Sequence, residues 1–424
     1  MRYFSPRHQR IRGIIEWSAN LGTAVALGVS CFVAVGVAFA AEEIATSWTD
    51  GDPQRTLSDP HLLGAATLLS DGRVLAAGGL NRLAAGFPAV TTAEMYDPAA
   101  RTWVKTGPLN TPRWSLDAIT LGDGKALFAG GASAFSAAPA LNTAELYDPT
   151  TGTFSLTSNT LSVGRQSFGI SALKDGRILI TGGNPQGNRL DGSGLTAVDL
   201  YNPETDQFRA VAAMHQGRAL HAQVTLRDGR VLVIGGAQKT AEIYDPAQDA
   251  WTLLPGELPT TLKDTKAFET SGGSIFLAGG QNTVDGLTTD ASWFLDLSSG
   301  QFTAGPSMAG FNHGPSGVQV GVSDYSAFDL FPEGHPRRGL YFLFAGGEHD
   351  PLVGPDIEYN SASIFDVAHR RFVNAGPMPF VHDDHTESLL QINDQGHPEV
   401  LLFGGNSSQG TSRFELDTSS LPAE

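Results

Sequence analysis

Asp-Gly-Arg-Ile-Leu-Ile-Thr-Gly-Gly, at residues 175–183, is the stretch that decides the fold. Asp-Gly is typical of a two-residue turn that needs positive φ, so it predicts the tip of a hairpin. The uncharged run from Ile178 to Thr181 predicts a buried strand, which the glycine doublet ends. A hairpin whose second strand ends in Gly-Gly is therefore the unit to look for elsewhere in the chain.

This glycine doublet occurs seven times, each time after an apolar strand. Self-similarity of this kind is the signature of a repeat architecture. Further Asp-Gly turns at Gly72, Gly124 and Gly229 precede three of the other doublets. The seven doublets are Gly78-Gly79, Gly130-Gly131, Gly182-Gly183, Gly235-Gly236, Gly279-Gly280, Gly346-Gly347 and Gly404-Gly405.

Two aromatic markers follow the doublets in fixed order. The first ends a short strand before a turn: Tyr96, Tyr147, Tyr201, Tyr244, Phe294, Phe365 and Phe414. The second lies in the next strand: Trp103, Phe154, Phe208, Trp251, Phe302 and Phe372. No second marker follows Phe414, whereas Trp48 stands upstream without a doublet before it. The two markers become equal in number, seven each, if the strand around Trp48 completes the unit that Phe414 begins.

These markers resemble Kelch repeats, in which an apolar strand ends in Gly-Gly and a spaced Tyr and Trp follow, and they span residues 44–417. The resemblance implies an all-β fold, a seven-bladed Kelch-type β-propeller with four antiparallel strands per blade around a channel. We expect the N-terminal strand around Trp48 to close the last blade. Glycine allows close backbone approach and the aromatics fill the wedge between blades, so most motif residues are expected to serve packing.

The N-terminus differs in kind from the repeats. Four arginines precede an uncharged run, residues 21–40, that ends in Ala-Phe-Ala. This pattern predicts a signal peptide over residues 1–40 and export of residues 41–424, a single propeller, to the periplasm or the outside. An uncleaved anchor is the alternative, because about 20 apolar residues can span a bilayer. After cleavage we expect no membrane span.

Charge and cysteine content limit the kinds of partner and of crosslink that this chain can have. The chain has 27 Lys and Arg against 44 Asp and Glu, and removing residues 1–40 takes away four arginines and one glutamate, which leaves a net charge of −20. Phosphate backbones would be repelled, so no nucleic-acid partner is expected. Cys31 is the only cysteine and lies in the apolar run, so the exported chain would lack disulfides. We expect a monomer.

One face of the propeller should carry any binding site. Five of the seven loops between a doublet and its first aromatic are longer than a minimal connection, and long loops on a rigid scaffold are where binding usually resides. Four residues begin innermost strands on this face and should ring the channel mouth: His61, Arg113, Arg165 and Arg218. Guanidinium groups bind carboxylates or sugar hydroxyls, and the resemblance implies that such rings sometimes bind acidic peptides. Alternatively, each arginine fixes a neighbouring loop carbonyl or the Asp of an adjacent turn.

Histidines and carboxylates gather near the start of the seventh blade, on the same face. The candidates for proton transfer are Asp384, His385 and Glu387. The candidates for ligands of a divalent metal are His313, His349, His382 and His385. A metal needs several such ligands converging at bonding distance, and spacing alone leaves a metal site and a solvated loop both open. No other cofactor is expected.

Among catalytic relatives, the resemblance points to galactose oxidase, which holds copper with His and Tyr and carries a Cys-Tyr crosslink. Here Asp384-His385-Thr386 lacks the tyrosine and the exported chain would lack cysteine, so copper-radical chemistry is not expected. We therefore favour a binding module for a carbohydrate or protein partner, using the long-loop face. The alternative is a carbohydrate-active enzyme (a mutarotase, lyase or oxidase-like enzyme) at the channel mouth. In that alternative an arginine holds a carboxylated sugar and His385 or Asp384 moves a proton.

Overall fold

The computed structural model separates residues 1–41 from a compact unit, residues 42–424. It describes residues 44–422 except 60, 82–83, 85–86, 135–138, 188–193, 309–323, 350–356, 383–385, 394 and 406–409, and except the side chains of 349, 357–358, 387, 389 and 391. The predicted signal peptide lies outside the described residues. Within them, no helix has the length and apolarity needed to cross a membrane.

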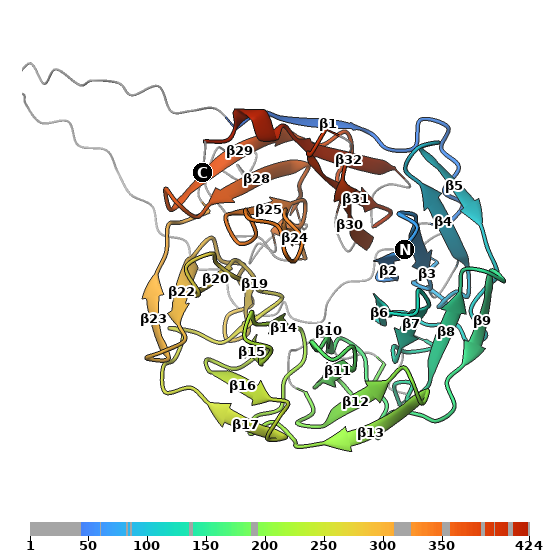
Figure 1. The fold of residues 1–424 in the computed structure, drawn as a ribbon, viewed down its shortest axis with the longest axis horizontal. Helices are drawn as coiled ribbons and strands as arrows, with labels where there is room; N and C mark the ends of the chain where they lie inside the picture. The colour runs from blue at the N-terminus through green and yellow to red at the C-terminus, as the bar shows by residue number, and fades with distance from the viewer. Residues whose placement is uncertain are drawn as a thin grey trace, which may run out of the picture. The chain divides into compact units, whose positions relative to one another are not determined.

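Seven four-stranded antiparallel sheets form a ring in the compact unit (Figure 1). Blades 1 to 4 are β2 (Ala65–Leu68), β3 (Val74–Ala77), β4 (Ala93–Asp97), β5 (Thr102–Lys105); β6 (Asp117–Thr120), β7 (Ala126–Ala129), β8 (Ala144–Asp148), β9 (Thr153–Leu156); β10 (Gly169–Ala172), β11 (Ile178–Thr181), β12 (Val198–Asn202), β13 (Gln207–Val211); β14 (His221–Thr225), β15 (Val231–Gly235), β16 (Ala241–Asp245), β17 (Ala250–Leu253). Blades 5 to 7 are β19 (Lys266–Glu269), β20 (Ile275–Ala278), β22 (Ser292–Asp296), β23 (Gln301–Ala304); β24 (Ser326–Asp329), β25 (Tyr341–Ala345), β28 (Ser361–Asp366), β29 (Arg371–Pro377); β30 (Thr386–Ile392), β31 (Pro398–Phe403), β32 (Thr411–Leu416), β1 (Thr46–Asp50). Two short pairs, β18 (Leu262–Lys263) with β21 (Gln281–Asn282) and β26 (Glu348–His349) with β27 (Ile357–Glu358), and one 3-10 turn, η1 (Thr418–Ser420), complete the described elements.

Each glycine doublet lets one blade approach the next. Both glycines of every doublet have positive φ, for example 60° at Gly182 and 92° at Gly183. A Cβ on Gly182 would lie 2.3 Å from the carbonyl oxygen of Arg218 in the following blade. The amide of Gly183 donates a hydrogen bond of 2.8 Å to that same oxygen. This close approach explains why glycine recurs at the same place in every repeat, because a side chain at Gly182 would push the neighbouring blades apart.

Aromatic markers fill the wedges between blades, as predicted. Tyr96 on β4 and Trp103 on β5 lie opposite each other in register, with ring centroids 5.1 Å apart. Trp103 also packs 4.4 Å from Phe403 of the preceding blade. Both Tyr96 and Trp103 are buried. Their burial in a cluster shared by blades 7 and 1 shows how the repeat covers the face of its neighbour.

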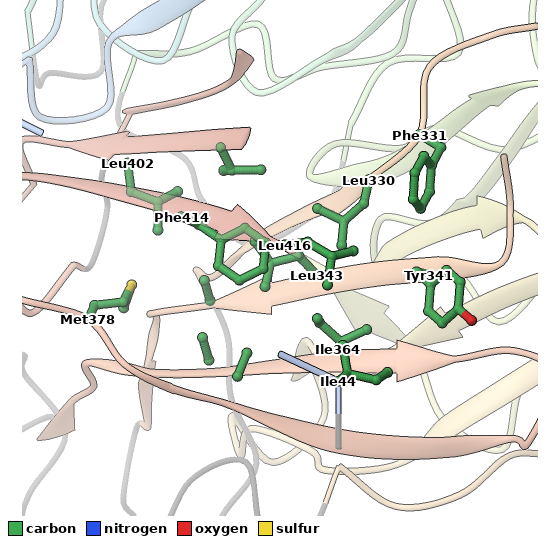
Figure 2. Close-up of a cluster of buried hydrophobic side chains, with 14 of the residues drawn as sticks. Ile44, Leu330, Phe331, Tyr341, Leu343, Ile364, Met378, Leu402, Phe414 and Leu416 are labelled. Carbon is green, nitrogen blue, oxygen red and sulfur yellow. The ribbon is translucent and has the colours of Figure 1, made fainter. Parts of the chain in front are cut away.

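The N-terminal strand closes the ring. β1 pairs antiparallel with β32 as the outermost strand of blade 7, and Trp48 lies opposite Phe414 with ring centroids 5.0 Å apart. The indole Nε1 of Trp48 donates to the carbonyl of Ala375 in blade 6 at 2.9 Å. Ile44 and Phe414 belong to one buried cluster that also takes in Leu343 of blade 6 (Figure 2). The predicted seven-bladed propeller, with its last blade completed by the strand around Trp48, is confirmed.

Candidate functional site at the mouth of the central channel

The predicted ring of basic residues is buried rather than open to a ligand. His61, Arg113, Arg165 and Arg218 precede the innermost strands of blades 1 to 4, and none has exposed surface. Each donates a hydrogen bond to the carbonyl of the first glycine of its own doublet. The distances are 2.8 Å from His61 to Gly78, 2.9 Å from Arg113 to Gly130, 3.1 Å from Arg165 to Gly182 and 2.8 Å from Arg218 to Gly235.

A buried carboxylate completes each of these contacts. Arg113 pairs with Glu145 at 3.0 Å and Arg218 with Glu242 at 3.2 Å, and both partners are fully buried. Glu94 and Asp199 are the partners of His61 and Arg165. These carboxylates were not among the candidates predicted from the sequence, although each stands two residues before the Tyr marker of its repeat. The geometry matches the alternative in which each arginine fixes a neighbouring carbonyl, since a buried cation needs such partners.

Of the predicted histidine and acidic candidates, only His382 has a described side chain. It takes the position of the arginines in blade 7, where its Nδ1 donates to the carbonyl of Gly404 at 3.4 Å and its Nε2 lies 2.8 Å from Ser412 Oγ. Burial lowers the pKa of His382 to about 4, so the ring is neutral. His313, Asp384 and His385 lie outside the described residues, as do the side chains of His349 and Glu387. In the described part of the chain, no three His, Cys, Asp or Glu side chains gather as a metal site.

A ring of backbone hydrogen bonds joins successive blades at the channel mouth. Leu63, Ser115, Ser167, Leu220 and Asp264 occupy the same place in blades 1 to 5, just before the innermost strand, with φ between 51° and 57°. From Ser115 onward, the amide of each residue donates to the carbonyl of the equivalent residue in the preceding blade. The distances are 2.8 Å for Ser115, 3.2 Å for Ser167, 2.9 Å for Leu220 and 2.9 Å for Asp264. These shared bonds explain why non-glycine residues hold a positive φ here.

Two cavities adjoin inside this mouth, at the centre that the innermost strands surround (Figure 1). One has a volume of about 340 Å³ and is lined by residues of blades 2 to 6, among them His221 and Asp264. The other, of about 250 Å³, includes Asp324 in its lining. Asp117 and Lys266 line both cavities. The channel mouth thus brings together three carboxylates and a lysine from blades 2, 5 and 6.

Two carboxylates of the channel mouth, Asp117 and Asp264, lie in surroundings that disfavour their charged form. Burial raises the pKa of Asp117 to about 6, against the opposing effects of the Ala118 amide and the Lys266 charge. Burial and, next, the charge of Asp324 raise the pKa of Asp264 to about 7. The ammonium of Lys263, 3.5 Å from the Asp264 carboxylate, works against that rise. Raised carboxyl pKa values in a cavity are a mark of a functional site.

These channel-mouth residues were not among the sequence candidates. Asp117 and Lys266 both stand 13 residues before the first glycine of their doublets, and Asp264 stands 15 before. Measured from the doublets, Asp117 and Lys266 therefore occupy equivalent positions, and this equivalence is a signal in the sequence that points to them. The arginines, 17 residues before the doublet, are the stronger signal because the same charge recurs there. The position 13 residues before the doublet holds a mixed set of Ala, Asp, Gly and Lys in blades 1 to 5.

Comparison with known proteins supports the fold. No protein-family model matches the chain. Galactose oxidase of Gibberella zeae is 29% identical over 168 residues, which are 36% of this chain and 23% of the relative. A Kelch repeat-containing protein of Arabidopsis thaliana is 32% identical over 88 residues, 19% of this chain and 21% of the relative. The chain therefore spans less than a quarter of the length of these curated relatives.

Among solved structures, a fungal alcohol oxidase of the AA5 family, in complex with copper, superposes with a TM-score of 0.60 at 14% identity. The superposition covers 89% of this chain and 78% of the oxidase. In the described part of this chain, no three His, Cys, Asp or Glu side chains come together to hold such a metal. His61, His221 and His382 lie in three different blades, and both ring nitrogens of His61 and His382 are engaged by the protein.

The seven doublets, the seven blades and the matches to both relatives agree on one architecture. The chain is a seven-bladed β-propeller: parts of it are similar in sequence to galactose oxidase and to a Kelch repeat-containing protein, and its fold is similar to that of the AA5 oxidase.

Proposed function

We propose that this propeller is an exported recognition module that binds a carbohydrate at the mouth of its central channel. The observation that carries the proposal is the cavity of about 340 Å³ lined by Asp117, Asp264, Lys266 and Phe268. Ligand pockets of this kind measure roughly 300–1,000 Å³ and combine a few converging polar groups with apolar or aromatic walls. Carboxylates accept hydrogen bonds from sugar hydroxyls and an ammonium donates to ring oxygens, so this lining suits a polyhydroxylated ligand.

Rigidity of the mouth supports the same proposal. The backbone hydrogen bonds from Leu63 to Asp264 fix the chain just before the innermost strands of blades 1 to 5, so the side chains that follow there are already in place. A site that needs no reordering loses less free energy when it binds a ligand. The loops that follow the doublets begin near this mouth. The amide of Gly79, the second glycine of the first doublet, donates to the carbonyl of Arg113 at 2.7 Å, just before the innermost strand of blade 2. The long loops of this face would extend contacts to a larger saccharide.

Export belongs to the proposal as well. The arginine-rich start and the apolar run of residues 21–40, which ends in Ala-Phe-Ala, support a signal peptide. An exported module would meet saccharides at a cell surface or in the periplasm.

Isothermal titration calorimetry of the purified protein against a panel of neutral, acidic and amino monosaccharides and disaccharides tests the proposal. We expect at least one saccharide to bind, and Asp117→Asn to weaken its binding by about tenfold, the scale of one lost charge-assisted hydrogen bond. Asp123→Asn is the matched control, because Asp123 lies at an exposed hairpin tip between β6 and β7. Binding of no saccharide, or equal weakening by both variants, would overturn the proposal.

A carbohydrate-active enzyme is the second candidate, and the raised carboxyl pKa values favour it. At neutral pH an Asp264 carboxyl with a pKa of about 7 is partly protonated and can act as a general acid. Asp117, with a pKa of about 6, is mostly ionised and can act as a base. Turnover of the same panel would identify this activity, and it should be lost in Asp264→Asn. Unchanged turnover in that variant would exclude Asp264 as the acid.

A further inference from the structure

Three neighbouring hairpins surround a cavity on the face of the propeller opposite the channel mouth. Each of these hairpins joins the first and second strands of its blade, at the strand ends that lie away from the glycine doublets. The cavity has a volume of about 430 Å³. Its lining comes from Arg227 between β14 and β15, from Ser271 between β19 and β20, and from residues 333–336 and 338 between β24 and β25. Blades 4, 5 and 6 therefore all contribute to this cavity.

Contacts with blades 5 and 6 fix the guanidinium of Arg227 in this cavity. Its Nη1 donates to the Thr270 carbonyl, and its Nη2 donates to the Arg338 carbonyl at 3.1 Å. Gly339 has a φ of 77°, and a Cβ there would lie 2.6 Å from Arg227 Nη2, so the glycine lets blade 6 approach this guanidinium. A guanidinium has five N–H groups. Two are used, and the other three form no hydrogen bond within the described residues.

The guanidinium of Arg338 has no fixed acceptor. Its side chain is only 25% exposed, yet it forms no hydrogen bond within the part of the chain that the structure describes. The carboxylate of Glu333 lies 3.5 Å from Arg338 Nη1, but Glu333 is 77% exposed, and such surface ion pairs contribute little. Guanidinium groups form their strongest hydrogen bonds with anionic oxygens, often two at a time. Arg338 thus presents a charged donor group to the cavity.

His335 adds a neutral donor to the lining. The Arg337 amide donates to His335 Nδ1 at 3.1 Å, so Nδ1 is an acceptor and the proton of the ring lies on Nε2. The imidazole stacks on the Phe331 ring, with centroids 4.6 Å apart and an interplanar angle of 23°. Stacking and the Nδ1 hydrogen bond together fix the plane of the ring. Nε2–H has no hydrogen-bond partner among the described residues.

Donors exceed acceptors among the side chains of this lining, and the local charge is positive. The donors are Arg227, Ser271, His335 and Arg338. Glu333 is the one acidic side chain of the lining, which leaves a net charge of +1, and Glu269, 3.8 Å from Arg227, lies outside the lining. The whole chain has a net charge of −17, so a locally positive cavity differs from the rest of the molecule. An anion with several acceptor oxygens complements these side chains.

We propose that this cavity binds a sulfate or phosphate group, either as the free ion or as an ester on a larger ligand. Such a group has three or four terminal oxygens, which can accept from Arg227 of blade 4, Ser271 of blade 5 and Arg338 of blade 6 together. A carboxylate offers only two oxygens and would leave one of these donors unpaired. The site lies on the other face from the proposed carbohydrate site and does not depend on it.

Titration calorimetry at low ionic strength, with inorganic sulfate, inorganic phosphate and galactose 6-sulfate as probes, tests this inference. We expect all three to bind, and galactose 6-sulfate to bind more tightly than galactose. Arg338→Gln should weaken the three anions by about tenfold, because it removes a charged donor. It breaks no hydrogen bond inside the protein, so the variant is expected to fold. Arg230→Gln is the matched control, since Arg230 lies in the same hairpin as Arg227 but pairs with Asp228 outside the lining. It should change the affinities by less than twofold.

Two further measurements test the charge and the shape of the site. Glu333→Gln should strengthen sulfate binding by about threefold, because it removes the carboxylate that repels the anion. Glucuronate should bind at least about fivefold more weakly than galactose 6-sulfate, because its carboxylate pairs with fewer donors.

The outcomes separate the source of the anion from the existence of the site. Tighter binding of galactose 6-sulfate than of inorganic sulfate would assign the site to an ester, and equal binding would assign it to the free ion. Binding of no anion, equal losses in Arg338→Gln and Arg230→Gln, or equal affinities for glucuronate and galactose 6-sulfate would overturn the proposal. Asp117→Asn should leave sulfate binding unchanged, so this inference and the carbohydrate-binding proposal can fail independently.

Discussion

Trp48→Ala should lower the free energy of unfolding by about 3 kcal/mol, because three contributions are lost together. The pairing with Phe414, at 5.0 Å between ring centroids, contributes about 1 kcal/mol. The hydrogen bond from the indole to the Ala375 carbonyl contributes about another 1 kcal/mol. Burial of part of the indole adds about 1 kcal/mol, less than for a fully buried tryptophan because Trp48 remains partly exposed.

Guanidinium chloride unfolding at equilibrium, followed by tryptophan fluorescence and circular dichroism, measures this loss. Trp48→Phe separates the contributions: the ring remains against Phe414 but the N–H donor is gone, so a loss of about 1 kcal/mol is expected. Val104→Ala on β5 is the control. Val104 also lies on an outermost strand, but it is 61% exposed, and its replacement should change stability by less than about 0.5 kcal/mol.

An unfolding midpoint for Trp48→Ala equal to that of the unmodified protein would refute the reasoning. It would mean that β1 contributes nothing to the stability of blade 7 or to its contact with blade 6. The same result for a protein lacking residues 44–52 would extend that conclusion to the strand as a whole, because such a deletion is expected to cost several kcal/mol.

Three further changes test the ring and the buried ion pairs. Arg165→Met should lower the free energy of unfolding, measured with denaturant, by about 3–5 kcal/mol, because the buried Asp199 carboxylate is left without its partner. Adding Asp199→Leu to the same variant should recover part of that loss. Gly182→Ala, with φ at 60° and a carbonyl 2.3 Å from the new Cβ, should cost well over 2 kcal/mol or prevent folding, whereas Gly176→Ala, with φ at 83° in open space, should cost only about 1 kcal/mol. The pKa of His382 is about 4 in the fold and about 6.5 when unfolded, so the unfolded chain takes up the proton first; stability should therefore fall as pH drops from about 6.5 to 4, and His382→Gln should flatten that part of the profile.

Charged side chains that are close in sequence lie in different surroundings in this propeller, either between two blades or facing the channel. The Arg113 side chain lies between blades, and its guanidinium donates hydrogen bonds to the carbonyls of Gly130 and Thr143 and to the Glu145 carboxylate. Asp117, only four residues later, lines the open channel. The two positions differ in whether the neighbouring blade covers them, and that difference decides which charge faces the channel.

The number of blades and their closure were readable in the sequence alone. Gly182 and its six counterparts mark strand ends because a side chain there would meet the next blade, so the doublet is a local pattern with a local cause. Trp48 could be assigned to blade 7 because one aromatic strand was missing from the count and one was in excess. Repetition made these signals reliable, since each unit buries its face only against another unit like itself.

The candidate site was decided by the tertiary structure. Arg113, Arg165 and Arg218 have the charge and the register of a ligand-binding ring, yet their partners Glu145, Asp199 and Glu242 lie far along the chain and reach them only after each blade has formed. Asp117 and Lys266 are 149 positions apart and share a cavity only because the ring closes. Sequence periodicity states which positions are equivalent in the repeat. The packing of one blade against the next determines which of those side chains are buried and which face the channel.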